Sequence, residues 1–231
     1  LLYLITSIPM ELSFASESQS IGRDLFLVDL ILDAFFLADI WCRLRKFAIV
    51  KDGFLISAPN EFWQIYRRDE FSLDMLSAFP ASFVAYCTGA TGRWYGIFRL
   101  VQLLRAVRFG KYLDDVVEII HTKTRFVVTT AALRVFQIFM TILVLSHWFS
   151  CVLHFIGSVQ DETIEQTWLV VDGMQDETIG RRYLRSFFWS LYTITTTGYG
   201  SVPIVTIPER VFAMMVMAVG AVICDAGLTA V

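Results

Sequence analysis

The 231-residue sequence has few of the residues on which catalytic and metal sites depend, and it carries little charge. It contains three histidines and four scattered cysteines, without a Cys-x-x-Cys pair or a metal-ligand spacing. It also lacks a Walker loop and any recognisable Ser/His/Asp order. Only 18% of the residues are charged, and the net charge of −3 leaves no basic footprint for nucleic acid. We therefore expect no enzyme active site, no cofactor or metal site, and no nucleic-acid partner in this chain.

Apolar residues are abundant instead. Hydrophobic residues make up 56% of the chain, whereas soluble domains carry about 45–50%. A helix that crosses a bilayer needs about 20 mostly apolar residues. Runs of this kind occupy residues 1–14, 25–42, 71–86, 93–120, 126–156 and 207–231. The composition predicts an all-α, multi-pass membrane protein, and the chain reads as a fragment because apolar runs lie at both ends.

The fourth of these runs carries polar residues at every third position. The basic residues of this pattern are Arg99, Arg105, Arg108 and Lys111, and Gln102 lies in the same register. At the 100° per residue of an α-helix, a three-residue step drifts slowly and gives a gently spiralling stripe. The expected counter-charges are acids within the second and third runs, namely Asp33, Asp39 and Asp74. One charge crossing 100 mV is worth about 2.3 kcal/mol, so several of these cations moving across the membrane could drive a gate. We therefore predict a voltage-sensing helix.

Two other interpretations of this stripe stay open. An amphipathic helix at the cytoplasmic interface would hold its basic face on anionic lipid, but it would not explain the three acids in the neighbouring runs. A static, ion-paired scaffold would explain both sets of charges without any movement.

A shorter apolar stretch precedes a glycine-containing turn. Residues 187–195 would form a helix of about 14 Å, too short for a hydrocarbon core of about 30 Å, so a re-entrant helix is expected. The residues that follow resemble a potassium-channel selectivity filter, whose carbonyls replace the hydration shell of the ion. Glycine permits the backbone dihedrals that point successive carbonyls inward. The predicted K⁺-coordinating residues are Thr196, Thr197, Gly198, Tyr199 and Gly200.

Such a filter is assembled from four copies around an axis, so we predict a homotetramer in the bilayer. Potassium would be its permeant ion, and no other metal is expected. The plasma membrane is the expected location.

Several motifs resemble one superfamily over nearly the whole chain. They are residues 8–14, residues 32–39, residues 71–80 and the His147-Trp148 pair with Cys151. They are similar to six-span, voltage-gated-like cation channels whose tail binds cyclic nucleotides, which include the ether-à-go-go, plant inward-rectifier, hyperpolarization-activated and cyclic-nucleotide-gated groups. The resemblance implies that Phe36 and Asp39 are the charge-transfer aromatic and acid. A cyclic nucleotide is expected at a domain outside this chain.

The resemblance also implies two domains. Residues 1–121 would form a four-helix voltage-sensor-like bundle with a truncated first helix. Residues 122–231 would form a two-helix pore domain, with a fifth helix, turret, re-entrant pore helix, filter and sixth helix, truncated before the cytoplasmic tail.

In the last helix, Gly220 matches the family's hinge glycine, and Cys224 is expected to line the cavity. Asp225 either faces the cavity and concentrates potassium there, or is paired or protonated. Upstream, Ser201 stands where potassium filters usually have Asp, and Tyr192 stands where some have Glu. The hydrogen bonds behind this filter must therefore differ from those of the family.

Taken together, these features predict a voltage-sensitive, potassium-selective tetrameric channel modulated by cyclic nucleotide. Thr196 favours potassium selectivity, because the hyperpolarization-activated group has Cys at this place. A poorly selective pacemaker-like cation channel is the first alternative. A membrane sensor or channel module fused to a signalling enzyme such as a cyclase is the second. The charge stripe does not indicate which sign of voltage opens the pore.

Overall fold

The computed structural model describes residues 2–14, 26–46, 49–51, 54–56, 75–76, 79–80, 83–84, 87–88, 93–108, 130–159 and 166–229. This part of the chain is mostly helical, as the composition predicts. Its helices are α1 (Leu2–Phe14), α3 (Phe26–Lys46), α7 (Arg93–Arg99), the 3₁₀ helix η1 (Leu100–Arg108), α9 (Thr130–Val159), α10 (Trp168–Val171), α11 (Ile179–Ile194) and α12 (Ile207–Thr229). Only short pieces of the third predicted run are among the described residues, and Asp74 lies outside them.

One short hairpin adds to the helical class that the sequence predicts. Strands β1 (Ile49–Lys51) and β2 (Phe54–Ile56) pair antiparallel, with Ile49 opposite Ile56 and Lys51 opposite Phe54. The two residues between the strands are Asp-Gly, a dipeptide typical of two-residue hairpin loops. The sequence therefore held a signal for this hairpin that the apolar periodicity did not show.

Two of the described helices are long and apolar enough to cross a membrane by length and composition. They cover Ala131–Val159 in α9 and Ile207–Asp225 in α12, each with a mean hydropathy of 1.8. Helix α3 has 21 residues, but three aspartates and a basic end lower its apolar character. The six-span layout therefore stays a prediction.

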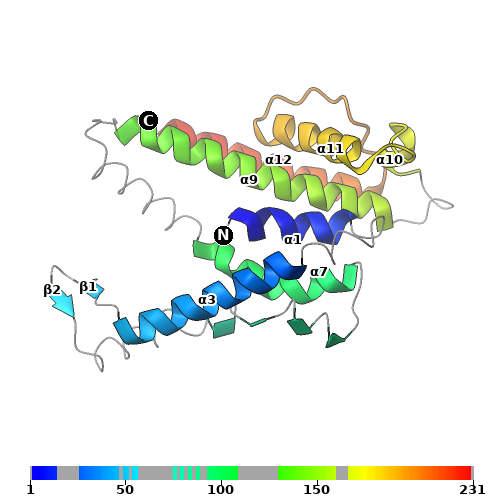
Figure 1. Cartoon of the computed structure of the whole chain (residues 1–231). Coiled ribbons are helices and arrows are strands. Elements are labelled where there is room, and N and C mark those ends of the chain that lie inside the picture. The colour runs from blue at the N-terminus through cyan, green and yellow to red at the C-terminus, as the bar shows by residue number, and fades with distance from the viewer. Residues whose placement is uncertain are drawn as a thin grey trace.

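The helices pack in layers around α1 (Figure 1). Helix α1 lies against α9 on one side and against α7 and η1 on another, while α11 lies on α9 and α12. The main core is on the α11 side, where Trp168, Trp189, Phe212 and Val216 are buried together with residues of α9. Gly157 of α9 makes room for Trp168, because a Cβ at this glycine would lie 2.6 Å from the indole nitrogen.

Helix α1 is fastened to α9 through two of its own carbonyl groups. Pro9 lies inside α1 and has no N–H, so the carbonyl of Ile5, four residues earlier, lacks its helical donor. Trp148 Nε1 donates to this carbonyl at 3.0 Å, and His147 Nε2 donates to the carbonyl of Thr6 at 2.9 Å. His147 Nδ1 is then the acceptor for the Tyr183 hydroxyl, at 2.8 Å. The His147-Trp148 motif thus joins α1, α9 and α11.

Candidate functional site

The predicted filter follows directly on the end of α11. Thr196, Gly198 and Gly200 have φ values of 58°, 65° and 66°. Positive φ at every second residue turns alternate peptide planes over, so that successive carbonyls can face the same side. Glycine adopts this region readily, whereas threonine seldom does. The sequence predicted such dihedrals at the two glycines, and the structure adds Thr196, the one non-glycine residue with positive φ in the described ranges.

Backbone carbonyls near the end of α11 hold the inner end of the filter segment, and one of them accepts two hydrogen bonds. Tyr192 O accepts hydrogen bonds from the backbone N–H groups of Thr197, at 2.9 Å, and Gly198, at 3.1 Å. The whole of residues 196–200 is exposed in the single chain, including 69% of Tyr199. The Tyr199 ring stacks on Phe188 with a centroid distance of 6.1 Å. One side of the filter therefore rests on α11, and the other side is open.

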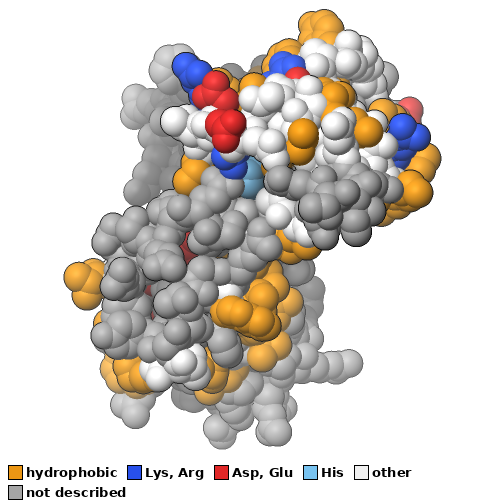
Figure 2. Space-filling model, turned by 90° about the vertical axis from the view of Figure 1, so that its right-hand side faces the viewer, with side chains coloured by type: hydrophobic (Ala, Val, Ile, Leu, Met, Phe, Trp, Pro, Cys, Tyr) orange, Lys and Arg blue, Asp and Glu red, His pale blue; other side chains and the backbone are white. Residues whose placement is uncertain are grey.

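Helix α11 is longer than the nine-residue apolar stretch predicted. It has 16 residues from Ile179 to Ile194, or about 24 Å at 1.5 Å per residue. The sequence missed its first two turns because they are polar, and these turns carry arginines that pair with the preceding loop. Arg181 bonds Glu177 at 2.9 Å, and Arg185 bonds Asp172 at 2.6 Å. In Figure 2, most of the visible described charged side chains lie on the upper part of the face in view.

Glu209 connects the start of α12 to the turret and to the residues after the filter. Its carboxylate accepts from the N–H groups of Trp168 at 3.0 Å, Val205 at 2.9 Å and Thr206 at 3.1 Å, and the residue is fully buried. Thr206 Oγ1 accepts in turn from Glu209 N at 3.4 Å. This reciprocal pair is a capping box. We did not predict Glu209, although the Thr-x-x-Glu spacing before an apolar run is the signal that could have found it.

Gly220 lies where α12 crosses the base of the filter. A Cβ there would lie 2.6 Å from the carbonyl oxygen of Ile194 and 2.9 Å from its Cα. Glycine is therefore needed for close approach of the two backbones. Cys224 Sγ lies 3.8 Å from the same carbonyl, and Asp225 is exposed in the single chain. The hinge and cavity roles of these residues stay predictions.

In the sensor-like part, the first arginine of the stripe is buried between two acids. Arg99 Nη1 bonds both carboxylate oxygens of Glu11, at 2.5 and 2.6 Å, and Nη2 bonds Asp29 at 2.8 Å. The Arg99 side chain is 0% exposed. We predicted neither acid as a counter-charge. The available signals were an acid within an apolar helix for Glu11, and for Asp29 a position four residues before Asp33, on the same helix face.

The rest of the stripe is only partly described. Gln102 Nε2 donates to Asp33 at 2.9 Å, so this predicted acid faces the stripe at Gln102. Arg105 and Arg108 lie in η1 and Asp39 lies in α3, but their side chains are not among those described, and Lys111 lies outside the described residues. Phe36 is half-buried, and its ring meets that of Phe35 edge to face, with 6.0 Å between the ring centroids.

The spiral predicted for the stripe is wrong for its described part. Residues 100–108 form a 3₁₀ helix, which has 3.0 residues per turn rather than 3.6. A three-residue step along such a helix returns to the same face, so the backbone positions 102, 105 and 108 share one face. A polar residue at every third position is the pattern that such a helix keeps on one face, and runs of this length are uncommon.

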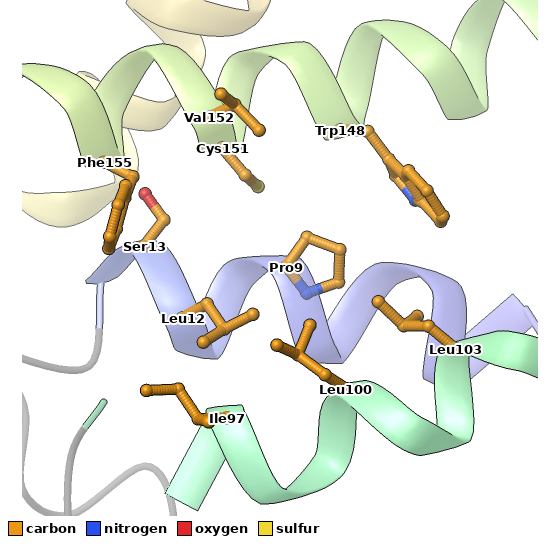
Figure 3. A pocket seen from close by; sticks show the side chains of 10 residues that line it. All are labelled: Pro9, Leu12, Ser13, Ile97, Leu100, Leu103, Trp148, Cys151, Val152 and Phe155. Carbon is orange, nitrogen blue, oxygen red and sulfur yellow. The ribbon is translucent and has the colours of Figure 1, made fainter. Parts of the chain in front are cut away.

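An apolar cavity of about 390 Å³ lies between α1, the α7–η1 segment and α9. Figure 3 shows side chains from α1, from α7 and η1, and from α9 around it. They are Pro9, Leu12, Ser13, Ile97, Leu100, Leu103, Trp148, Cys151, Val152 and Phe155. Leu100 and Leu103 come from the helix that carries the stripe. A movement of η1 would therefore change the shape of this cavity.

Comparisons with known proteins show the family to which this chain belongs. The family model for "Ion transport protein" matches residues 1–231. The chain is 26% identical over 238 residues to the potassium voltage-gated channel unc-103 of Caenorhabditis elegans, an alignment that covers 94% of this chain and 27% of that protein. It is 26% identical over 212 residues to the voltage-gated inwardly rectifying potassium channel KCNH6 of Homo sapiens, an alignment that covers 85% of this chain and 21% of that protein. It is 24% identical over 211 residues to the voltage-gated inwardly rectifying potassium channel KCNH2 of Sus scrofa, an alignment that covers 86% of this chain and 17% of that protein.

The chain thus spans little more than a quarter, or less, of the length of these curated relatives. Their names describe channels rather than enzymes, and the family is one of membrane proteins. The resemblance expected from the motifs is confirmed. Because the match extends over all 231 residues, this chain belongs to the ion transport protein family.

Proposed function

We propose that this chain forms the voltage sensor and pore of a tetrameric, potassium-selective channel in the plasma membrane. One observation carries the proposal: positive φ at Thr196, Gly198 and Gly200, in an exposed segment between α11 and α12. In this conformation the carbonyls of residues 196–199 can take the place of the water around K⁺. Ions then pass by repulsion between adjacent sites.

The open side of the filter supports a homotetramer. Residues 196–200 are exposed in the single chain, yet they adjoin the buried core around Trp189 and Tyr192. Three further copies around an axis would cover this face and complete each ring of oxygens. The six-span layout, with a sensor over 1–121 and a pore over 122–231, is part of this proposal. So is a cyclic-nucleotide site in a tail outside the chain.

The buried ion cluster supports a sensing role for the stripe. Arg99, Arg105, Arg108 and Lys111 would carry the gating charge. Asp33, Asp39, Asp74 and Phe36 would be positions that these cations pass, and the contacts of Arg99 add Glu11 and Asp29 to that set. Since buried charges require partners, a helix that exchanges one acid for the next can move without leaving a cation unpaired. The water-filled cavity of the pore, below the filter, would be lined by Gly220, Cys224 and Asp225.

Voltage-clamp recording of the full-length protein tests this proposal. Currents should depend on voltage, and their reversal potential should follow the potassium gradient when external Na⁺ replaces K⁺. Gly198→Ala should reduce this selectivity because alanine is strained at a φ of +65°. Gly180→Ala is the matched control, since Gly180 also has open space around it but no positive φ. Near-equal permeability to Na⁺ and K⁺ in the wild type would contradict the proposal.

A further inference from the structure

The peptide that follows the filter is held at both of its polar ends. The carbonyl of Ser201 and the N–H of Val202 belong to one peptide group, directly after Gly200. Arg185 Nη2 donates to Ser201 O at 2.8 Å, and Tyr192 Oη accepts from Val202 N at 3.3 Å. We call this pair of hydrogen bonds the outer filter contacts. Arg185 and Tyr192 are seven residues apart on α11, so two helical turns bring both side chains to the same face.

Arg185 is itself fixed from the turret. Its Nε lies 2.6 Å from Asp172 Oδ2, and its Nη2 lies 2.9 Å from Asp172 Oδ1. A bidentate pair of this kind sets the plane of the guanidinium as well as its position. Asp172 follows α10, whose Trp168 and Leu169 are buried in the core. The donor to Ser201 therefore comes from a side chain with little freedom to turn away.

Tyr192 holds the filter segment on both sides. Its backbone carbonyl accepts from Thr197 and Gly198, and its hydroxyl accepts from Val202. Tyr192 is 5% exposed and packs in the main core. Between these two attachments, a Cβ added at Gly198 or Gly200 would meet no atom of the described residues within 4 Å. The glycines themselves thus offer little resistance to rotation of the filter backbone.

We propose that Arg185 and Tyr192 are positioning residues that fix the orientation of the Ser201–Val202 peptide and thereby keep the filter conducting. The inference rests on the function proposed above. Rotation of this peptide requires the loss of one charge-assisted and one neutral hydrogen bond together. The arrangement also gives this filter an outer support without an acidic side chain at position 201, because the guanidinium binds the backbone carbonyl there.

The test is the decline of potassium current during a sustained opening voltage, recorded from the full-length protein. Arg185→Gln removes the charge and the bidentate pair, and it should speed the decline about tenfold. Tyr192→Phe removes only the hydroxyl, and it should speed the decline about threefold. Arg185→Lys keeps the charge without the planar fork and should fall between wild type and Arg185→Gln.

Arg181→Gln is the matched control. It removes an arginine of the same helix and its pair with Glu177, but this arginine is 71% exposed and the residue makes no outer filter contact. The potassium current of Arg181→Gln should decline at the same rate as that of the wild type. Raising external K⁺, which keeps the filter occupied, should slow the decline in Arg185→Gln and Tyr192→Phe more than in the control. A general loss of stability would not follow external K⁺ in this way.

The possible failures are distinguishable. If the wild type carries no potassium current, the proposed function fails. If the wild type conducts, and Arg185→Gln and Tyr192→Phe decline like Arg181→Gln at both K⁺ concentrations, the outer filter contacts do not position the filter and the inference is overturned. Surface labelling shows whether each variant reaches the membrane. Should Arg185→Gln not do so, Tyr192→Phe decides alone, and an unchanged rate refutes the inference.

Discussion

Two arginines in this chain show how one residue type is used in two ways. Arg99 is fully buried in the sensor-like region, and its ionic partners are carboxylates from α1 and α3. Arg185 lies at the outer end of the pore region with 30% of its side chain exposed, and it binds one carboxylate and one backbone carbonyl. Arg99 is thus surrounded by side chains from separate helices, whereas Arg185 is tied to the chain that forms the filter.

This difference fits the two proposed roles, a charge that moves and a side chain that stays fixed. A charge that moves needs partners it can exchange, and acids on neighbouring helices can follow one another along a path. A residue that positions a filter must itself stay in place, and Asp172 fixes the Arg185 guanidinium for its contact with the carbonyl next to Gly200. Burial also sets the energetic scale, because an uncompensated buried charge costs far more than an exposed one.

The largest effect is expected at Arg99. Arg99→Gln leaves Glu11 and Asp29 buried without the cation between them, which should lower the free energy of unfolding by about 3–5 kcal/mol. Thermal unfolding of the detergent-purified protein, followed by tryptophan fluorescence, measures this. Arg185→Gln should cost much less in the same assay, because Arg185 is partly exposed. Equal losses for the two variants would contradict the difference in burial on which this prediction rests.

The second prediction concerns the way the pore side is held. Gly220→Ala places a Cβ against the backbone of Ile194, which cannot turn aside as a side chain can. We expect a loss of about 1–3 kcal/mol in the free energy of unfolding, as for other overpacked sites. Gly180→Ala meets open space and should be neutral or slightly stabilising. If both variants unfold alike, close backbone packing does not support the filter base.

The third prediction lies at the boundary between the two regions. Val152→Phe adds apolar volume to the cavity beside Leu100 and Leu103 and should stabilise the sensor position seen here by about 1 kcal/mol. Spread over about three gating charges, this corresponds to a shift of about 15 mV in the half-activation voltage. Val159→Phe, on the same helix and away from the cavity, should not shift it. A shift of the same size in both variants would contradict a role for the cavity.

The smallest effect is expected at Arg181. Its pair with Glu177 is an exposed i,i+4 contact, with 71% of the Arg181 side chain accessible. Arg181→Gln should change the free energy of unfolding by at most about 0.5 kcal/mol. Denaturant titration beside Arg185→Gln measures the contrast. A larger loss at Arg181 than at Arg185 would show that position on α11, rather than the contact with the filter, determines the effect.

Much of the fold followed from local patterns. The apolar runs located α9 and α12 within a few residues, because helix length and composition are properties of the chain itself. The two glycines of the filter indicated where the backbone turns, and their φ values agree. The His147-Trp148 motif was recognised, but its contact with the carbonyls near Pro9 depends on two helices meeting.

The features that the sequence did not predict depend on contacts between separate elements. Glu11 and Asp29 bind Arg99 across helices far apart in the sequence, and nothing local chooses them over Asp39 or Asp74. The polar start of α11 carries no apolar signal, and Arg185 within it pairs with Asp172, which lies 13 residues earlier in the turret. Likewise, the three-residue period of the stripe was visible, but the 3₁₀ helix that keeps it in line was not inferred.

The most direct measurement is an experimental structure of the full-length protein purified in K⁺. We expect four copies around one axis, with ion density between the carbonyls of residues 196–199 and the Ser201 carbonyl bound by Arg185. A monomer, or a tetramer whose residues 196–200 point away from the axis without bound ions, would contradict the proposed pore.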